Sequence, residues 1–306
     1  MTIENLRLSV VICSYNRAKY IANAMESLYN QSIDKSLYEV FVVDNNSTDN
    51  TKEICQDYIA KNTDFNIRYI EEKRQGATYA RNTGAALAKG KYLVFMDDDA
   101  EANVDFLERI LIFFKNNPNA DGVGGRIIPL YIPEEPKWMS YYVSSLVGNF
   151  DYSNTVKEFA PEKFPLESNM VTPKQLFDEV GGFDENLLGV VGTLRIGGES
   201  KGYHIKLQKM GKRIYYDPTI IVRHVIETEK LTRAYMYRVA SGIGRGERAR
   251  TLAISYWSFI KKNIEYFIKW GASIILAVKY TLKGNPSQAL PIIQFRNDAF
   301  LGLWGK

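Results

Sequence analysis

The sequence lacks several features that mark common classes of protein. Its two cysteines, Cys13 and Cys55, are too few for a disulfide framework and have no zinc-binding spacing. We expect both to be small apolar core residues in a reducing compartment. Residues 1–8 carry charge where a secretory signal needs an apolar run, so we do not expect secretion.

Long apolar runs and familiar phosphate loops are also missing. In the C-terminal region, the longest uncharged stretch near the centre is Trp270 to Val278, far short of the roughly 18 apolar residues of a membrane span. No Gly-x-Gly-x-x-Gly follows the first expected strand, so a dinucleotide site is unsupported. The segment Gly84 to Lys91 resembles a phosphate loop only in part, because it precedes a strand and lacks the final Ser or Thr.

The composition is that of an ordinary globular protein, but charge is unevenly distributed. The 306 residues are 45% hydrophobic and 24% charged, with a net charge of +4. Residues 230–306 hold thirteen Lys and Arg against three Asp and Glu, a net +10, which leaves −6 for residues 1–229. We expect the basic region to meet an anionic partner. Membrane lipid is the favoured candidate and nucleic acid is not expected, since no recognised binding module surrounds these charges.

Three consecutive carboxylates, Asp97, Asp98 and Asp99, follow an apolar run that predicts a strand. Alternate side chains of a strand point to opposite faces, so we expect Asp97 and Asp99 to share one face and Asp98 to point away. Oxygen ligands of this kind suit Mg²⁺ or Mn²⁺. The alternative is a solvated loop in which one Asp caps the next helix.

Strand-like and helical segments alternate through the first hundred residues, which predicts an open, mostly parallel α/β sheet covered on both faces. The expected strands are 8–13, 40–43, 67–70 and 92–96, and the helices between them include 50–60 and 77–88. Farther along, 214–216 and 220–222 are expected as separate strands divided by Asp217 and Pro218. Polar clusters at 14–17, 44–49 and 97–99 fall at the carboxyl ends of expected strands, where such sheets bind ligands.

Taken together, these motifs resemble the family-2 glycosyltransferases of the GT-A fold, of the type that builds bacterial cell-surface polysaccharides. The resemblance covers about residues 7–226 and has seven motifs in the family's order. They are Val10–Arg17, Val42–Asp49, Gly76 with Ala80–Gly84, Phe95–Asp99, Gly181–Glu185, Gly198-Glu199, and Pro218 with His224.

The resemblance implies roles for individual residues. It implies a nucleotide-sugar site formed by Ser14, Tyr15, Arg17, Asp44, Arg81 and Asp98. It implies that Asp97 and Asp99, with His224, hold Mn²⁺ or Mg²⁺, which neutralises charge on the departing nucleoside diphosphate. Arg81 as a surface charge and His224 as a structural residue are the alternatives.

The expected catalytic base departs from the family pattern. Inverting members carry an acidic pair where this sequence has Glu199-Ser200, and one carboxylate of the pair deprotonates the acceptor hydroxyl. We expect Glu199 to be the base, with Asp184 and Glu185 as fallback candidates. Ser200 leaves open a weakened or altered activity.

We expect residues 1–229 to form a GT-A catalytic domain, with a nucleotide-binding half at 1–120 and an acceptor-binding half at 121–229. Residues 230–306 are expected to form a basic, aromatic helical extension that lies on anionic membrane. The alternative is that its helices pack on the catalytic domain or on a second subunit, as in a homodimer. We expect a cytoplasmic protein, with any membrane contact peripheral and on the inner face of the cell membrane.

The resemblance therefore implies a metal-dependent enzyme that moves a sugar, with inversion, from a nucleoside-diphosphate sugar to a hydroxyl of a glycan or lipid-linked acceptor. UDP is the expected nucleotide. The alternative is a catalytically silent nucleotide-sugar or glycan-binding protein of the same fold. A nucleotidyltransferase is disfavoured, because the glycine-rich loop with an Arg after the first strand is missing.

Overall fold

The computed structural model describes residues 7–161, 163–186, 189–191, 194–196 and 199–305. The chain divides into two compact units. The first comprises residues 1–128, 150–188 and 199–224, and the second comprises residues 129–149, 189–198 and 225–306. The second unit thus includes the segments 129–149 and 189–198, both of which precede residue 229. The domain boundary expected at residue 229 stays a prediction.

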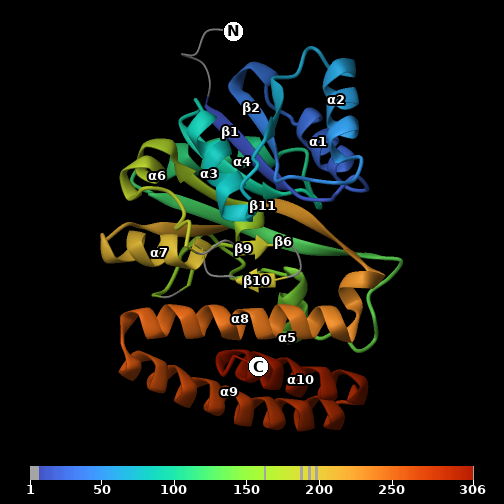
Figure 1. Cartoon of the computed structure of the whole chain (residues 1–306), viewed down its shortest axis with the longest axis vertical. Helices are drawn as coiled ribbons and strands as arrows, with labels where there is room; N and C mark the ends of the chain where they lie inside the picture. The colour runs from blue at the N-terminus through green and yellow to red at the C-terminus, as the bar shows by residue number, and fades with distance from the viewer. Residues whose placement is uncertain (1–6, 162, 187–188, 192–193, 197–198, 306) are drawn as a thin grey trace. The chain divides into compact units, whose positions relative to one another are not determined.

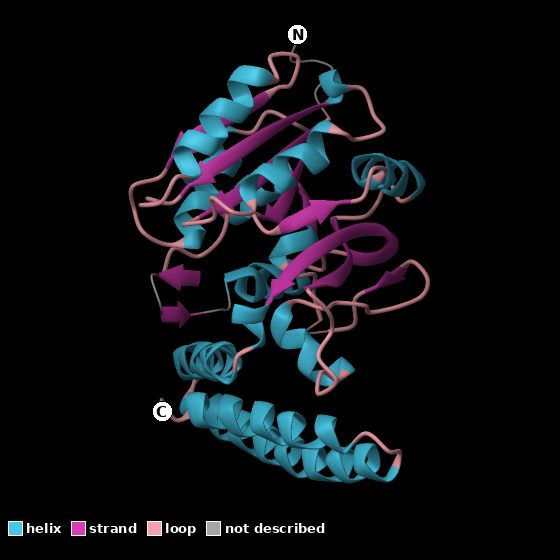
Figure 2. Ribbon diagram, turned by 90° about the vertical axis from the view of Figure 1, so that its right-hand side faces the viewer, coloured by secondary structure: helices cyan, strands magenta, loops and turns pink. Residues whose placement is uncertain are grey.

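A mixed β-sheet forms the centre of the first unit (Figures 1 and 2). Four strands run parallel, in the order β3 (Ile67–Glu71), β2 (Tyr38–Asp44), β1 (Leu8–Ser14) and β4 (Tyr92–Asp97). The order continues through β8 (Met170–Pro173), β6 (Gly122–Ile132), β11 (Ile214–Glu227) and β5 (Ala100–Ala102), while β7 (Lys157–Glu158) pairs with β11. The four strands predicted in the N-terminal region are confirmed to within two residues at each end.

The parallel strands are buried on both faces because their alternate side chains belong to two different cores. Val10 and Ile12 of β1 enter one core and Val11 enters the other. The first core contains side chains of α1 (Ile21–Tyr29), α2 (Thr51–Lys61) and α4 (Phe106–Asn116). The second contains side chains of α3 (Ala77–Leu87), α6 (Lys174–Val180) and α7 (Glu199–Lys209).

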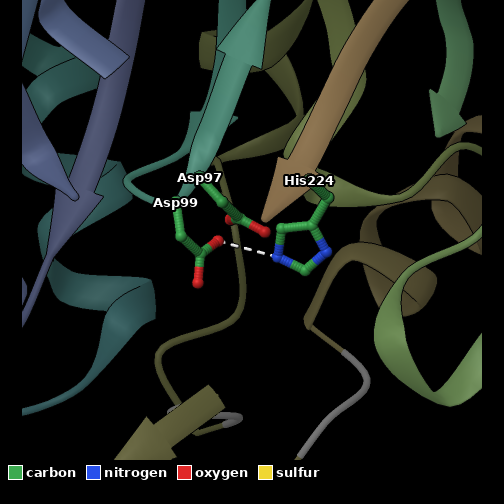
Figure 3. Close-up of side chains that lie close together, drawn as sticks. All are labelled: Asp97, Asp99 and His224. Carbon is green, nitrogen blue, oxygen red and sulfur yellow. Dashed lines mark ion pairs between the residues drawn. The ribbon is translucent and has the colours of Figure 1, made fainter. Parts of the chain in front are cut away.

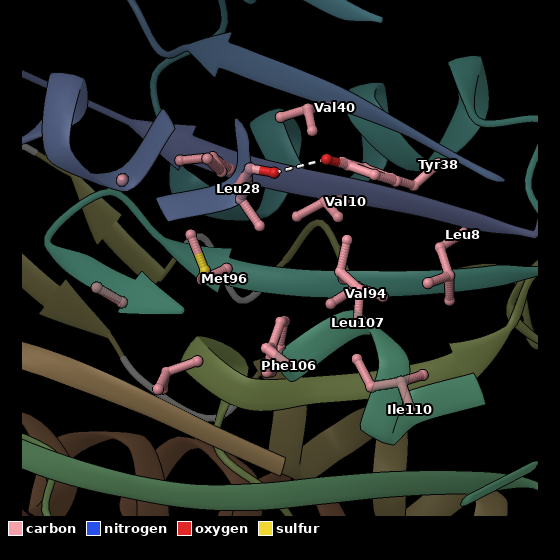
Figure 4. Packing of buried hydrophobic residues seen from close by; sticks show 14 of the residues in the cluster. Leu8, Val10, Leu28, Tyr38, Val40, Val94, Met96, Phe106, Leu107 and Ile110 are labelled. Carbon is pink, nitrogen blue, oxygen red and sulfur yellow. Dashed lines mark hydrogen bonds between the residues drawn. The ribbon is translucent and has the colours of Figure 1, made fainter. Parts of the chain in front are cut away.

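Two details show how closely these layers pack. In the first core the buried Tyr38 hydroxyl donates a hydrogen bond to the carbonyl oxygen of Leu28 at 2.7 Å, so its polar end is satisfied inside the apolar cluster (Figure 4). On the other face, a Cβ on Gly84 of α3 would lie 2.5 Å from a methyl carbon of Val11. A glycine at this position therefore lets α3 lie directly against β1.

Strand β11 corrects one prediction. The sequence predicted two strands separated by Asp217 and Pro218, but the structure has one continuous strand from Ile214 to Glu227. The Asp217 carboxylate accepts hydrogen bonds from the backbone N–H and the hydroxyl of Thr219, at 2.8 and 2.7 Å. These bonds support the backbone beside the proline, so the strand continues through it.

The second unit is mostly helical. It contains α5 (Tyr141–Ser144), α8 (Arg233–Ile254), α9 (Tyr256–Leu282), α10 (Ala289–Leu303) and a small antiparallel sheet of β9 (Gly189–Val191) and β10 (Leu194–Ile196). The three long helices lie side by side (Figure 1). Among the described residues, no helix is long and apolar enough to span a bilayer.

Close contact between α8 and α10 organises this helical core. A Cβ on Gly302 of α10 would lie 2.1 Å from the carbonyl oxygen of Ser241 in α8, so the two helices meet backbone to backbone there. Nearby, a pocket of about 200 Å³ has a mainly apolar lining that includes Phe295. Arg233 and Asp298 also line it, and they form a bidentate ion pair with N···O distances of 2.6 and 2.7 Å.

Candidate active site

Three strands of the first unit end at the same edge of the sheet, and each ends in a polar residue. Ser14, Asp44 and Asp97 are the last residues of β1, β2 and β4. Ser14 lies opposite Asp44 in the register of β1 and β2, and Cys13 lies opposite Asp97 in the register of β1 and β4. The predicted convergence of polar strand ends is therefore confirmed.

Asp97, Asp99 and His224 form a compact cluster at this edge (Figure 3). Their potential ligand atoms all lie within 4.8 Å of one another, and His224 Nε2 is 2.7 Å from Asp99 Oδ1. The register explains the approach, because β5 begins at Ala100 and pairs antiparallel with β11, where Ala100 lies opposite His224. Two segments far apart in sequence thus supply one set of side chains.

The geometry of the triplet differs from the simple strand picture. Asp97 ends β4, but Asp98 and Asp99 form the turn that leads into β5. Asp97 and Asp99 do belong to the same cluster, as predicted. The reason is the turn and the pairing of β5 with β11, and not the alternation of side chains along a strand.

Two arginines lie beside the three carboxylates. Arg81 Nη2 is 3.5 Å from Asp97 Oδ1, and Arg17 Nε is 3.5 Å from Asp98 Oδ1 and 3.9 Å from Asp99 Oδ2. Their positive charges reduce the repulsion among three adjacent carboxylates. The structure thus brings Arg17 and Arg81, both predicted to be site residues, to the acidic cluster.

Asp98 is buried and turned toward Arg17. Burial, together with the neighbouring charge of Asp99, raises the pKa of its carboxyl to about 7. The positive charge of Arg17 acts in the opposite direction, because it favours the ionised form. The partner of the Asp98 carboxylate is thus a side chain of the protein, Arg17. The Asp97 side chain is instead 33% exposed, so solvent or a ligand can reach it.

The residues in the cluster fit a divalent metal ion. Two carboxylates and one imidazole offer two oxygen ligands and one nitrogen ligand, a set that Mn²⁺ accepts. The partial exposure of Asp97 leaves one side of the cluster open to a further ligand. This arrangement, with protein ligands on one side and an accessible position on the other, suits a metal ion that also contacts a substrate.

The loops after β1 and β2 are held together by hydrogen bonds around residues with left-handed backbones. Asn16 (φ 54°) accepts a bond from the Thr48 N–H at 2.8 Å and donates its own N–H to the Ser47 hydroxyl at 2.9 Å. Asp44 is buried and accepts bonds from the Ser47 N–H at 3.0 Å and from the Tyr69 hydroxyl at 2.6 Å. Of the predicted nucleotide residues, Ser14 and Asp44 end neighbouring strands at this edge, and Tyr15 and Arg17 follow β1 there.

Two asparagines that the sequence analysis assigned no role support this edge. The buried Asn45 donates to the carbonyl oxygens of Glu72 and Arg74, at 3.2 and 2.7 Å, and accepts from the Gly76 N–H at 2.7 Å. Asn82 exchanges two hydrogen bonds of 3.0 Å with the backbone of Phe183. Both asparagines lie within the motifs that carry the family resemblance. Their hydrogen bonds, however, join loops whose residues are far apart in the sequence.

Comparison with known proteins identifies the family. The sequence model described as "Glycosyl transferase family 2" matches residues 9–181, more than half of the chain. The chain belongs to glycosyl transferase family 2. The predicted GT-A fold is also confirmed by the solved structures that this family-2 chain resembles.

Relatives of this family-2 chain come from archaea and bacteria. A glucosyl-dolichyl phosphate glucuronosyltransferase of Haloferax volcanii is 29% identical over 222 residues, which cover 72% of this chain and 69% of the relative. The curated relatives are matched over 14% to 69% of their own lengths.

Two solved structures share the fold. The mannosyltransferase PcManGT from Pyrobaculum calidifontis, in complex with GDP-Man and Mn²⁺, aligns with a TM-score of 0.67 and 19% identity over 98% of this chain and 88% of that one. Residues 1–349 of S. aureus TarS, in complex with UDP, align with a TM-score of 0.57 and 18% identity over 98% of this chain and 92% of that one.

The family-2 acidic pair remains the least defined part of the site. Glu199 begins α7, but its side chain lies outside the described part of the structure. Ser200 is buried, and its hydroxyl donates to the carbonyl oxygen of Pro165 at 3.5 Å. Asp184 is half-buried and accepts hydrogen bonds from the backbone and side-chain amides of Asn186, at 3.0 and 2.9 Å. The base roles of Glu199 and Asp184 therefore stay predictions.

Proposed function

We propose that the protein is a metal-dependent glycosyltransferase that moves a sugar from a nucleoside-diphosphate sugar to a hydroxyl of a glycan or lipid-linked acceptor. The observation that carries this proposal is the cluster of Asp97, Asp99 and His224 at the carboxyl edge of the parallel strands in a family-2 chain. The nucleotide complexes of two proteins with this fold support a nucleoside-diphosphate donor, and we propose a UDP-sugar. The process served is cell-surface polysaccharide synthesis.

The residues at the sheet edge would divide the work of holding the donor. Asp44 and the neighbouring loops hold the base and ribose, because each carboxylate oxygen can accept a second hydrogen bond. Asp97, Asp99 and His224 would hold Mn²⁺ or Mg²⁺, and the ion would supply Lewis-acid stabilisation of the charge on the leaving diphosphate. Arg17 and Arg81, which lie beside these carboxylates, would contact the nucleotide of the donor.

The transfer itself needs a base for the acceptor. We propose that the Glu199 carboxylate removes the proton of the acceptor hydroxyl while the acceptor oxygen attacks the anomeric carbon. The bond from that carbon to the diphosphate oxygen breaks, and the diphosphate takes the electron pair. Because attack and departure occur on opposite faces of the sugar, the configuration at the anomeric carbon inverts.

We also propose that the acceptor is lipid-linked and that the enzyme works at the cytoplasmic face of the membrane as a peripheral protein. The name of the Haloferax relative, which specifies a dolichyl phosphate glycan, supports this acceptor class. The net charge of +10 in residues 230–306 supports attraction to an anionic surface.

A turnover assay tests the activity. The purified chain is incubated with a panel of sugar nucleotides and lipid-linked acceptors, with Mn²⁺ or with a chelator, and nucleoside diphosphate release is measured. We expect turnover that needs the metal and is lost in Asp99→Ala. Asp64→Ala, which removes an exposed carboxylate paired with Lys35, is the matched control and should keep full activity. Full turnover by Asp99→Ala would refute the metal role.

The second candidate function is a catalytically silent nucleotide-sugar or glycan-binding protein. The buried hydroxyl of Ser200 supports it, because this residue stands where inverting members have a second carboxylate. Glu199→Gln separates the two functions. A drop of about 10²- to 10⁴-fold in turnover is expected of a general base. Tight UDP binding without turnover on any acceptor, unchanged by Glu199→Gln, would favour the silent protein.

A further inference from the structure

Helix α9 has two apolar faces, and the described residues of the second unit bury only one of them. Phe259, Ser273 and Ala277 are buried on the face that packs within the unit. Another set of large apolar side chains is more than half exposed, comprising Ile264, Phe267, Ile268, Ile275, Val278 and Leu282. We call these six residues the α9 stripe.

The spacing of the α9 stripe places it on one side of the helix. Apart from the adjacent Phe267 and Ile268, its members follow one another at intervals of three, four or seven residues. At about 100° per residue, all six fall within an arc of about 100° on one side of the α-helix. Ile275 is 74% exposed and Leu282 is 83% exposed, although either would normally be buried. A solvent-exposed apolar row of this length indicates a binding surface.

Lysines give this surface a specific charge. Lys261, Lys279 and Lys283 are exposed on or just beyond α9. The single carboxylate of α9, Glu265, accepts hydrogen bonds from Lys262 and Lys269, and these bonds help to lower its pKa to about 2. Its negative charge is thus matched within the helix and does not offset the three exposed lysines.

We infer that the α9 stripe and its lysines lie on the surface of an anionic lipid bilayer. An apolar row bordered by lysines is the pattern of a helix that lies in the membrane interface, with the row among the acyl chains and the ammonium groups at the lipid phosphates. A second copy of the chain is a poorer occupant. In a twofold dimer across α9, lysines would meet lysines with no free carboxylate from either α9 between them. The inference deepens the proposed peripheral attachment and does not depend on which sugar is transferred.

Flotation with lipid vesicles tests the inference on the full chain. Vesicles of phosphatidylglycerol and phosphatidylcholine in equal amounts should carry the protein upward, and vesicles of phosphatidylcholine alone should carry far less. The double variant Ile268→Asp with Ile275→Asp should reduce partitioning at least 100-fold, because it places two charges where acyl chains are expected. Changing Lys261, Lys279 and Lys283 to Gln should reduce partitioning to the anionic vesicles about 100-fold.

Matched variants on the first unit control for exposure and charge. Val104 and Met210 are exposed apolar residues, and their double change to Asp should leave flotation unchanged. Changing Lys61, Lys89 and Lys115, all exposed, to Gln should do the same. Circular dichroism of each variant confirms that it is folded.

Two results would overturn the inference. One is that the wild type does not float with the anionic vesicles, or floats no better than the double variant Ile268→Asp with Ile275→Asp. The other is a vesicle-free dimer, seen by light scattering, that dissociates in this variant, since the stripe would then be a protein interface. Neither result bears on the transferase proposal, because nucleoside diphosphate release with a soluble donor is measured separately.

Discussion

The acidic cluster allows a sharp test of which carboxylates bind the metal. Asp97, Asp98 and Asp99 with Arg17 and Arg81 carry about one net negative charge when all three carboxyls are ionised, so a divalent cation is attracted despite the arginines. Changing an ionised Asp to Asn removes one negative charge. With the proposed ligand set, only changes at Asp97 and Asp99 would remove a metal ligand, because Asp98 is turned toward Arg17.

Ligand-induced stabilisation gives the size of the effect. At a Mn²⁺ concentration of about 100 times Kd, binding stabilises the folded state by about 2.7 kcal/mol. For a unit of this size that raises Tm by roughly 5 to 10 °C. If losing a ligand weakens binding about 100-fold, the same Mn²⁺ concentration stabilises Asp99→Asn by only about 0.4 kcal/mol, which is roughly 1 °C.

Thermal unfolding with and without Mn²⁺ is the assay. We expect the wild type and Asp98→Asn to show the full Tm increase, and Asp97→Asn and Asp99→Asn to show almost none. Equal losses in all three variants would mean that charge alone attracts the metal. A full increase in Asp99→Asn would refute the assigned ligands.

Three further predictions concern stability, measured by chemical denaturation. Gly302→Ala should lower the free energy of unfolding by about 1–3 kcal/mol, because its Cβ would lie 2.1 Å from a carbonyl oxygen of α8. Gly271→Ala on α9, where a Cβ meets nothing within 4 Å, should instead raise it by about 0.5–1 kcal/mol, and destabilisation there would contradict the packing argument. Arg233→Met should cost about 3 kcal/mol by leaving buried Asp298 without its partner, whereas adding Asp298→Leu should recover most of that loss; no recovery would contradict the ion-pair explanation. Burial lowers the pKa of His204 to about 4, below its usual 6.5 in the unfolded chain. The contribution of His204 to the free energy of unfolding is therefore complete above pH 6.5 and is lost as the pH falls toward 4. In His204→Leu, the free energy of unfolding should fall by up to about 3 kcal/mol less between pH 6.5 and pH 4 than in the wild type. An unchanged pH profile would refute the role of His204 in this pH dependence.

Much of the first unit was predictable from local patterns. The strands from 8 to 97 are short apolar runs followed by polar clusters, and the structure has them within two residues. The prediction of β11 was wrong because a proline usually interrupts a strand, and the compensating bonds from Asp217 to Thr219 are invisible in a single sequence.

The site was predictable where chain direction settles the geometry. Parallel strands end at the same edge of a sheet, so Ser14, Asp44 and Asp97 had to lie near one another once the strands were recognised. The roles of Asn45 and Asn82 could not be predicted, because hydrogen bonds to backbone groups more than twenty residues away depend on how the loops fold.

The sequence by itself determined the alternation of strands and helices, the acidic strand end and the basic C-terminal region, because each depends only on residues close together in the sequence. Only the tertiary structure decided that His224 meets Asp99, since that contact depends on the pairing of β5 with β11. It also decided which side of α9 is left exposed. Both faces of that helix are apolar, with Ala277 on one and Ile275 on the other, and only the packing of α8 and α10 shows which of them is buried.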